Sequence, residues 1–427
     1  MNDMVIRKFK IDELNPAKYN PRKKLKPGDK EFQKLEDSIK NFGYVELIVV
    51  NAANNNTVIS GHQRFSVLKH LGETEVECVV VELPETEEKA LNIAMNKVVG
   101  AWDENLLADL LKDLQDSNFD LGKTGFEPPE IEMLFNQVHN KDIVEDDFDV
   151  DSELKQPAFS KPGDVWHLGK HTVICGDSTD PATFDKLLEG RLVNLVLTDA
   201  PYFVNLQNKS GSIANDNLDD KSAYEFLMKV FANFKSAMAT DASFYEFYAT
   251  MKSRVFYDAF EDAGFKVGAQ LVWKKPRAPF MRTDWKFNME PIIFGWRKDG
   301  KHVWYGDQKQ KAVFEFDMIR DSEKDGFSHP SSKPVPLMAY LIQQSTMTNG
   351  LVLDGFLGSA STLIACEQTG RVCFGVELEQ KFVDVAVKRY ISFKEGRYED
   401  VYLIRDGQKL KFEEVATFDP EGGEGSE

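Results

Sequence analysis

The sequence has few cysteines and no long apolar run. Its cysteines are Cys78, Cys175, Cys366 and Cys373; they form no CxxC pair and have no histidine partners at zinc-site spacing. We therefore expect reduced thiols and no metal site. No stretch approaches the roughly 18 consecutive apolar residues that a membrane helix requires, and the N-terminus has no apolar stretch like that of a signal peptide. These absences predict a cytoplasmic protein without a membrane partner.

Composition and charge set further bounds. With 427 residues, 42% of them hydrophobic, the chain can bury a large core, which excludes a disordered or fibrous protein and favours two or three domains. The net charge is −18, of which residues 142–153 and 413–427 account for −13, whereas residues 7–30 carry +6 and residues 266–311 carry +7. Because phosphates respond to the local potential, DNA binding stays open. Solvated charged faces are the alternative.

Apolar patterns divide the chain into two units. Residues 1–136 combine short β-rich runs with helical patterns, the last of which begins at Pro128. Residues 137–160 lose apolar periodicity and are rich in acids, which is typical of a linker. Residues 161–411 alternate strands and helices, which predicts an α/β domain with a largely parallel sheet. The acidic tail, residues 412–427, is expected to be disordered.

The first chemical signal follows a strand expected at 192–198, which runs into Asp199-Ala200-Pro201-Tyr202. Open α/β sheets bind ligands at the carboxyl ends of such strands. A carboxylate, a backbone carbonyl beside proline and an aromatic ring suit a flat base with an exocyclic amine: the oxygens accept the amino hydrogens and the ring stacks on the base. By itself, Asp-x-Pro-Tyr also occurs in ordinary turns.

Two further strand ends indicate a nucleotide-type cofactor. The strand expected at 351–354 leads into small residues that open a helix, and such a turn lets a ligand approach the backbone. The strand expected at 371–377 ends in Glu377, 19 residues after Gly358. That spacing is close to the roughly 20-residue offset of an acid that binds ribose hydroxyls. The small-residue turn and the acid at the strand end are each weak indications of a cofactor site, and their order and spacing along the chain make the two together a stronger one.

These residues resemble the motifs of the β-class amino DNA methyltransferases, which use S-adenosylmethionine. Asp199–Tyr202 is similar to the family's Asp-Pro-Pro-Tyr tetrad, and Phe356–Ala360 is similar to its Phe-x-Gly-x-Gly loop. Cys175–Ser178 is similar to its upstream Gly-Asp motif, and His-Pro-x-x-Lys-Pro stands intact at His329–Pro334. With Glu377, the motifs follow the family's order over about residues 161–393.

The resemblance implies a Rossmann-like methyltransferase sheet and a mechanism. A target base is flipped out of double-stranded DNA. Asp199 and the carbonyl of Ala200 accept its amino hydrogens, Pro201 holds the loop, and Tyr202 stacks on the base. The residues implied to hold S-adenosylmethionine are Asp177, Asp354, Phe356, Gly358, Ser359 and Glu377, with Lys333 nearby. Because a tetrad that begins with Asp is usual for N6-adenine enzymes, adenine is the expected target.

Three positions depart from the family pattern. Ala200 replaces the first proline of the tetrad and loosens the backbone; Ala360 replaces the second glycine of the loop, where its methyl group is expected to crowd the cofactor. Gly355 replaces a proline after Asp354. The two alanines leave one alternative open, a DNA-binding regulator with a degenerate methyltransferase fold. N4-cytosine methylation, which would use the same residues, is the other.

The basic segment 266–311 lies where the family places target recognition. It mixes eleven Lys and Arg with aromatic residues, which can contact phosphates and stack on bases. The residues expected to contact DNA are Lys274, Lys275, Arg277, Arg282 and Lys286. At least half of the aromatics are expected in the core instead.

In the first unit, Gly61-His62-Gln63-Arg64 opens a helix, where N–H groups and an arginine can bind an anion. A plain turn with a surface arginine is the alternative. About residues 4–100 resemble the ParB N-terminal/sulfiredoxin-like domain, an α+β domain, with Asn20–Arg22 and Gly61–Arg64 similar to its motifs. His62 replaces the sulfiredoxin cysteine, so sulfinic-acid reduction is not expected. The resemblance implies a CTP-like nucleotide at Gly61–Arg64 or DNA contact through residues 7–30, and a bacterial or phage origin; it leaves the oligomeric state open.

Overall fold

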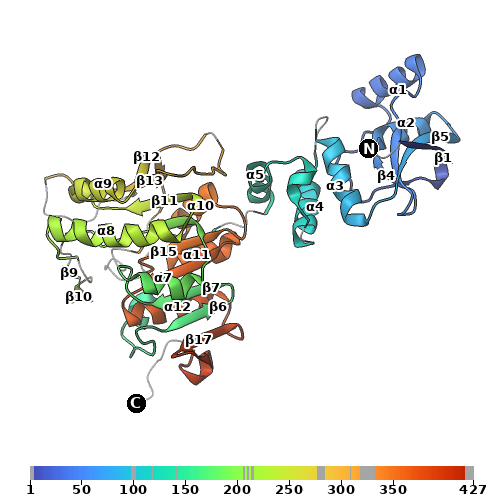
Figure 1. The fold of residues 1–427 in the computed structure, drawn as a ribbon. Coiled ribbons are helices and arrows are strands. Elements are labelled where there is room, and N and C mark those ends of the chain that lie inside the picture. The colour runs from blue at the N-terminus through green and yellow to red at the C-terminus, as the bar shows by residue number, and fades with distance from the viewer. Residues whose placement is uncertain are drawn as a thin grey trace. The chain divides into compact units, whose positions relative to one another are not determined.

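We describe a computed structural model of the 427-residue chain. The described residues are 4–97, 102–117, 119–139, 143–204, 207–208, 211–212, 216–276, 284–307, 309–317 and 332–418. Contacts divide the chain into two units, Met1–His139 and Asn140–Glu427 (Figure 1). No helix in the described ranges combines the length and the apolar character that crossing a membrane requires.

The first unit contains a five-stranded mixed sheet in the order β1-β5-β3-β4-β2. Its strands are β1 (Val5–Lys10), β2 (Asn15–Pro16), β3 (Ile48–Asn51), β4 (Thr57–Ser60) and β5 (Glu75–Val81). β5 alternates buried residues with exposed or half-buried ones, as expected for a strand with one face on a core. That core includes Ile48, Val50, Val58 and Cys78.

Helices pack against this sheet and continue beyond it. They are α1 (Lys30–Phe42), α2 (His62–His70), α3 (Glu85–Asn96), α4 (Glu104–Asp116) and α5 (Pro128–His139). Residues of α3, α4 and α5 share a separate apolar core that includes Ile93, Leu111 and Ile131. Asp103 caps α4 by accepting the N–H of Leu106 at 3.2 Å. The helical extension expected after the sheet is thus a packed helical group.

The second unit is built on one large sheet, whose described strands run in the order β14-β12-β13-β11-β8-β15-β16-β7-β6-β17-β18. They are β6 (Val165–Leu168), β7 (His171–Cys175), β8 (Val193–Thr198), β11 (Met238–Phe247), β12 (Phe265–Lys274), β13 (Met289–Arg297), β14 (Val313–Glu315), β15 (Leu351–Asp354), β16 (Val372–Glu377), β17 (Val401–Arg405) and β18 (Gln408–Lys411). β9 (Gln207–Asn208) and β10 (Gly211–Ser212) form a separate small hairpin. The central strands β7, β16, β15, β8 and β11 are parallel, which confirms the expected parallel sheet, and antiparallel strands flank them.

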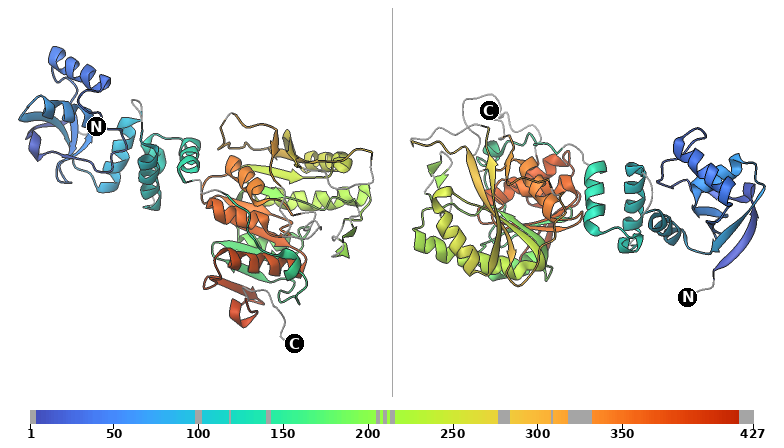
Figure 2. Two further views of the ribbon diagram at one scale, coloured as in Figure 1. Left: turned by 180° about the vertical axis from the view of Figure 1, so that it is seen from behind. Right: turned by 90° about the horizontal axis from the view of Figure 1, so that it is seen from above.

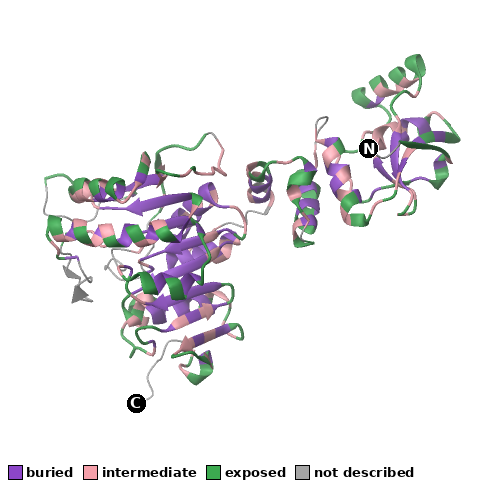
Figure 3. Cartoon of the chain, viewed as in Figure 1, coloured by how far each residue is buried: buried purple, intermediate pink, exposed green. Residues whose placement is uncertain are grey.

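Helices cover both faces of this sheet (Figure 2). α10 (Val335–Ser345), α11 (Ser361–Thr369) and α12 (Gln380–Phe393) pack on the face that contains Leu195 and Val352. α7 (Pro181–Leu188), α8 (Asp220–Ala237) and α9 (Ser253–Asp262) pack on the face that contains Val196 and Leu353. The central strands are therefore buried on both sides, as Figure 3 shows. This is the expected Rossmann-like arrangement.

The acidic segment 143–153 differs from the linker that its composition indicates, because it packs on the second unit. The N–H of Val144 donates to Gln368 on α11 at 3.1 Å, and Asp146 pairs with Arg389 on α12 at 2.9 Å. The segment also contains the short helix α6 (Val150–Glu153). Asp146 and Glu153 have specific basic partners, Arg389 and Lys388, and a count of acids along the sequence does not reveal such partners.

The tail also differs in part from the disorder expected of residues 412–427. Phe412 is 1% exposed and belongs to the core of the second unit, and Val415 and Phe418 pack against that core. Apolar side chains at this spacing dock the segment in spite of its acids. Residues 419–427 lie outside the described part of the chain.

Candidate functional site

Two strand ends that are far apart in the sequence meet in the large sheet. β8 and β15 are adjacent and parallel, so Asp199 and the loop after Asp354 leave the same edge. The hydroxyl of Thr198 donates to Oδ1 of Asp354 at 2.7 Å and accepts the N–H of Gly355 at 3.1 Å. Thr362 donates to Oδ2 of Asp354 at 2.6 Å, and burial raises the pKa of this carboxyl to about 6. Asp354 therefore braces the two loops, and its contact with a cofactor stays a prediction.

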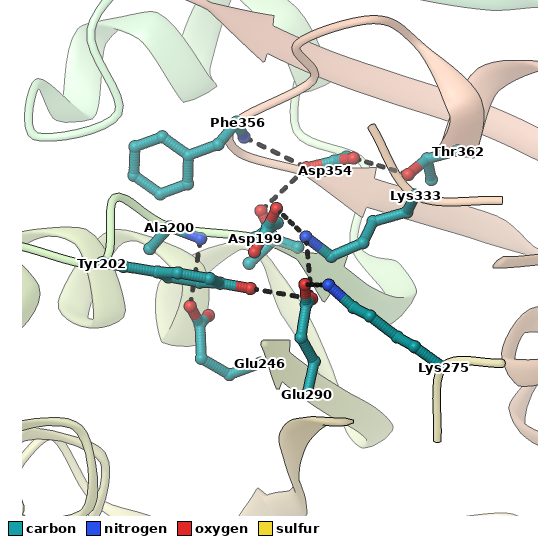
Figure 4. Close-up of polar contacts among 11 residues, drawn as sticks. Asp199, Ala200, Tyr202, Glu246, Lys275, Glu290, Lys333, Asp354, Phe356 and Thr362 are labelled. Atoms are coloured by element: carbon teal, nitrogen blue, oxygen red, sulfur yellow. Dashed lines mark hydrogen bonds and ion pairs between the residues drawn. The ribbon is translucent and has the colours of Figure 1, made fainter. Parts of the chain in front are cut away.

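Five side chains form a polar cluster beside β8, with the lysines buried and the other members partly buried (Figure 4). Lys333 pairs with Oδ2 of Asp199 and lies 3.3 Å from Oε2 of Glu290. Glu290, on β13, also pairs with Lys275 and accepts the hydroxyl of Tyr202 at 3.3 Å. Two carboxylates and two ammonium groups balance the charge of the cluster. Pairing of this kind is what permits charged groups to be buried.

One carboxylate oxygen of Asp199 has no hydrogen-bond donor among the described residues. Its Oδ1 is buried and accepts no hydrogen bond from the described residues. Burial raises the pKa of Asp199, although the ammonium group of Lys333 opposes that shift. Burial alone would lower the pKa of Lys333, but the carboxylates of Asp199 and Glu290 outweigh burial, so the pKa of Lys333 is raised. Leaving a buried acceptor without a donor costs about 1–3 kcal/mol. A donor on a bound molecule would satisfy Oδ1.

The second tetrad residue is held by Glu246, an acid that the sequence analysis missed. Glu246 lies on β11 opposite Thr198 of β8 and is fully buried. Its Oε1 accepts the N–H of Ala200 at 3.2 Å. Burial raises the pKa of Glu246 well above its ordinary value. An acid inside the aromatic run of residues 244–248 is the signal that could have indicated it.

The loop after β15 has the backbone of a glycine-rich turn. Gly358 and Ala360 have φ values of +51° and +68°, in the left-handed region. For a residue with a Cβ this conformation costs about 1–2 kcal/mol. Ala360 is fully buried and caps α11, at the position of the motif's second glycine. The structure therefore shows why glycine is expected there, and the alanine stores strain.

Gly355, the other departure in this loop, has a packing reason. A Cβ on Gly355 would collide with the ring of Phe234 on α8. The carbonyl of Gly355 also accepts the hydroxyl of Ser178 at 2.6 Å. Only glycine fits between the helix and the upstream motif without a shift.

Glu377 closes the same loop from the end of β16. Its Oε2 accepts the N–H of Gly358 at 2.8 Å and its Oε1 accepts the N–H of Glu379 at 2.8 Å. Burial raises the pKa of Glu377 to about 7. Ser359 lies on this loop too, and its carbonyl accepts from Arg389 at 2.6 Å. A carboxylate beside a turn of small residues fits a cofactor that carries ribose hydroxyls.

The upstream Gly-Asp motif lies beside this loop. The N–H of Gly176 donates to the carbonyl of Glu377 at 2.9 Å, and Ser178 contacts Gly355 as described above. Asp177 between them is exposed and accepts the N–H of Thr179 at 2.8 Å. Asp177 and Glu377 therefore lie at the same edge of the sheet, and their contact with a cofactor stays a prediction.

The residues expected to contact DNA do not share one environment. Lys274 pairs with Glu315 at 2.6 Å on the surface, and Lys286 is exposed. Lys275 is 9% exposed and belongs to the polar cluster through Glu290. The ammonium group of Lys275 already pairs with Glu290, so a phosphate would have to compete with that carboxylate, and the expected contact of Lys275 with DNA stays a prediction. Arg277 and Arg282 lie outside the described residues.

In the first unit, Gly61 begins α2 with a φ of +90°, a conformation that favours glycine. His62 is next in the chain, and its buried Nε2 has no hydrogen-bond partner in the described ranges. Burial lowers the pKa of His62 to about 4, so the ring is neutral. A neutral imidazole at this position can accept or donate a hydrogen bond but does not attract an anion by charge.

The other two residues of the motif already have protein partners. The amide of Gln63 accepts the N–H of Leu25 at 3.2 Å and donates to the carbonyl of Lys23 at 2.7 Å. Arg64 pairs with Glu46. A phosphate at the start of α2 would therefore compete with Glu46 for the guanidinium group.

Comparison with known families assigns both units. Residues 193–388 match the model of the N6/N4-type family described as DNA methylase. The second unit contains a DNA methylase domain. Residues 1–97 match the ParB N-terminal domain, and residues 105–162 match the ParB-methyltransferase HTH domain. The DNA methylase domain is thus joined to a ParB-type domain. The match to the HTH domain starts in the helical group that follows the first sheet, and the sequence had not indicated such a domain.

Individual DNA methyltransferases are similar to about half of the chain. The chain is 26% identical over 222 residues to the Type II methyltransferase M2.MboI of Moraxella bovis, which covers 46% of this chain and 80% of that protein. It is 22% identical, with a TM-score of 0.41, to the structure of the M1.HpyAVI–SAM complex, over 51% of this chain and 97% of that one. It is 19% identical, with a TM-score of 0.39, to the cytosine-N4-specific PvuII DNA methyltransferase, over 54% and 95%.

Proposed function

We propose that the protein is a site-specific DNA methyltransferase that transfers a methyl group from S-adenosylmethionine to the exocyclic N6 of adenine in double-stranded DNA. The observation that carries this proposal is the buried Oδ1 of Asp199, which has no donor among the described residues. An exocyclic amino group supplies that donor. Tyr202, three residues later, supplies an aromatic ring for the base.

In this proposal the chain's own residues act on the flipped base. Tyr202 stacks on it, with the tyrosine hydroxyl held by Glu290. Oδ1 of Asp199 and the carbonyl oxygen of Ala200 accept the two amino hydrogens, which keeps the nitrogen lone pair available. Asp199 then takes the proton that the nitrogen loses. Positioning and hydrogen bonding carry the reaction, because it needs no covalent enzyme intermediate.

The cofactor, when bound, supplies an electrophilic methyl carbon on a sulfonium. Glu377 would accept its ribose hydroxyls, and the loop with Phe356, Gly358 and Ser359 would contact its adenosine part from the side where Asp177 lies. Lys333 pairs with Asp199 and Glu290. We therefore assign Lys333 to the base side of the site and not to the cofactor loop.

Adenine is favoured over cytosine because the tetrad begins with Asp199, whereas Ser is more typical of N4-cytosine enzymes. The test is incubation of the purified full chain with unmethylated DNA and labelled S-adenosylmethionine, followed by digestion to nucleosides. Label on N6-methyladenine supports the proposal. Label on N4-methylcytosine keeps the mechanism and corrects the base.

A regulator that binds DNA without methylating it is the second candidate, and the strained Ala360 in the cofactor loop favours it. In that case folded protein transfers no label to DNA from several sources. Binding of S-adenosylmethionine, measured by calorimetry on the same sample, separates loss of the cofactor site from loss of chemistry.

For the first unit we propose a CTP-like nucleotide at the start of α2, with Arg64 released from Glu46 to meet its phosphates. Titration of the full chain with CTP tests this, and Arg64→Gln should abolish binding. We place the protein in the cytoplasm of a bacterial or phage-infected cell, where its DNA substrate is. In the CTP titration, followed by calorimetry, equal heats of binding for the wild type and for the Arg64 variant would contradict the assignment of the site.

A further inference from the structure

Ala200 has a backbone N–H that the proline of related Asp-Pro-Pro-Tyr tetrads lacks. In this chain the N–H is buried with Ala200 and donates to Oε1 of Glu246 at 3.2 Å. A proline at the same place could not make this bond. The bond therefore depends on the residue by which the chain departs from the tetrad pattern.

Among the described residues, Glu246 has no second hydrogen-bond partner that would explain its presence. It is fully buried on β11, and its Oε2 accepts no hydrogen bond within the described residues. The ammonium of Lys333 pairs with Asp199 and Glu290 instead. Burial of a polar group is costly unless a hydrogen bond compensates it. The N–H of Ala200 is the compensation that the structure shows.

We propose that Glu246 is a positioning residue: it anchors the peptide of Ala200, and so replaces the constraint that the proline ring gives in related tetrads. Proline fixes φ near −65°, whereas alanine leaves it free to rotate. β11 is a rigid anchor, because it pairs with β8 on one side and with β13 on the other. The anchored residue carries the carbonyl that accepts the second amino hydrogen, so the proposal rests on the proposed function.

The two devices exclude each other. With A200P alone, Glu246 loses its donor and stays buried. With E246M alone, the N–H of Ala200 loses its acceptor and the backbone gains freedom. In the double variant A200P/E246M both defects are removed, because the proline ring fixes φ at position 200 and position 246 no longer carries a buried acid that lacks a donor. Each change alone is therefore expected to lower activity more than the two changes combined in the double variant.

A double-mutant cycle on the full chain tests this coupling. For each variant we would measure kcat for methyl transfer, the Kd of S-adenosylmethionine and the midpoint of thermal unfolding. E246M and A200P should each lower kcat about ten-fold, since a small misplacement at a reacting centre is costly. The double variant should recover most of that loss. E246Q should retain most of kcat, because its amide oxygen still accepts the N–H, and the Kd should change little throughout.

Each outcome decides the proposal. Full activity of E246M or of A200P overturns it, as does a double variant no more active than the single ones. If E246M does not fold, comparison of A200P with the wild type and with the double variant decides. If the wild type transfers no methyl group at all, the proposed function fails, but the unfolding midpoints still report whether positions 200 and 246 are coupled.

Discussion

The N–H of Gly358 donates a hydrogen bond of 2.8 Å to Oε2 of Glu377. Gly358 belongs to the loop after β15 and Glu377 ends the adjacent parallel strand β16. The bond joins the two strand ends between which a ribose-bearing cofactor is expected. It also fixes the position of a buried carboxyl whose pKa burial raises to about 7.

Cofactor affinity should therefore rise with pH. A carboxyl with a pKa of about 7 is protonated below that pH and ionised above it, and a carboxylate accepts ribose hydroxyls more strongly than a neutral acid. Between about pH 6 and pH 8 the Kd of S-adenosylmethionine, measured by calorimetry, should fall. Glu377→Gln should weaken binding about ten-fold at the higher pH and remove the dependence. Glu225→Gln, on the exposed side of α8, is the control and should keep the pH dependence.

Asp199→Asn should lower kcat by about 10²–10³-fold, because a preorganised acceptor for the amino group is lost. Its amide would also face the ammonium of Lys333, which pairs with the carboxylate in the native protein. The Kd of the cofactor should not change. Asp185→Asn, on the exposed side of α7, serves as the control. Methyl transfer at the native rate by the Asp199 variant is the result that would remove this residue from the mechanism.

Two neighbouring lysine–glutamate pairs should differ strongly in their effect on stability. Glu290→Gln breaks the pair with the buried Lys275 and weakens the contact with Lys333, so it should lower the free energy of unfolding by about 3 kcal/mol. Glu315→Gln breaks the exposed pair with Lys274 and should change it by less than about 1 kcal/mol. Urea denaturation measures both. Equal effects would show that the polar cluster is not buried in solution.

Replacement of alanine by glycine should have opposite effects at two buried positions. Ala360 has a left-handed backbone, so Ala360→Gly should relieve strain and raise the free energy of unfolding by up to about 1 kcal/mol. Ala365 lies inside α11, where the same change should lower it by about 1 kcal/mol. Thermal unfolding of the two variants measures the contrast. If both lose stability equally, the loop does not have the described backbone.

The sequence by itself determined the parts of this protein that depend on local patterns. Apolar runs predicted the alternation of strands and helices, and the residues after β8, β15 and β16 indicated the chemistry of the strand ends. Gly358 and Glu377 were found in this way, because a turn of small residues and an acid at the end of a strand are visible in short stretches of chain.

Only the tertiary structure decided which side chains complete the site. Glu246 and Glu290 reach the tetrad from strands that are 46 residues beyond Ala200 and 88 beyond Tyr202. The acidic segment also finds its partner far along the chain, because Asp146 pairs with Arg389. The order of strands in the sheet brings these partners together. That order results from the packing of the whole core, so no pattern near Ala200 or Asp146 could have indicated the partner.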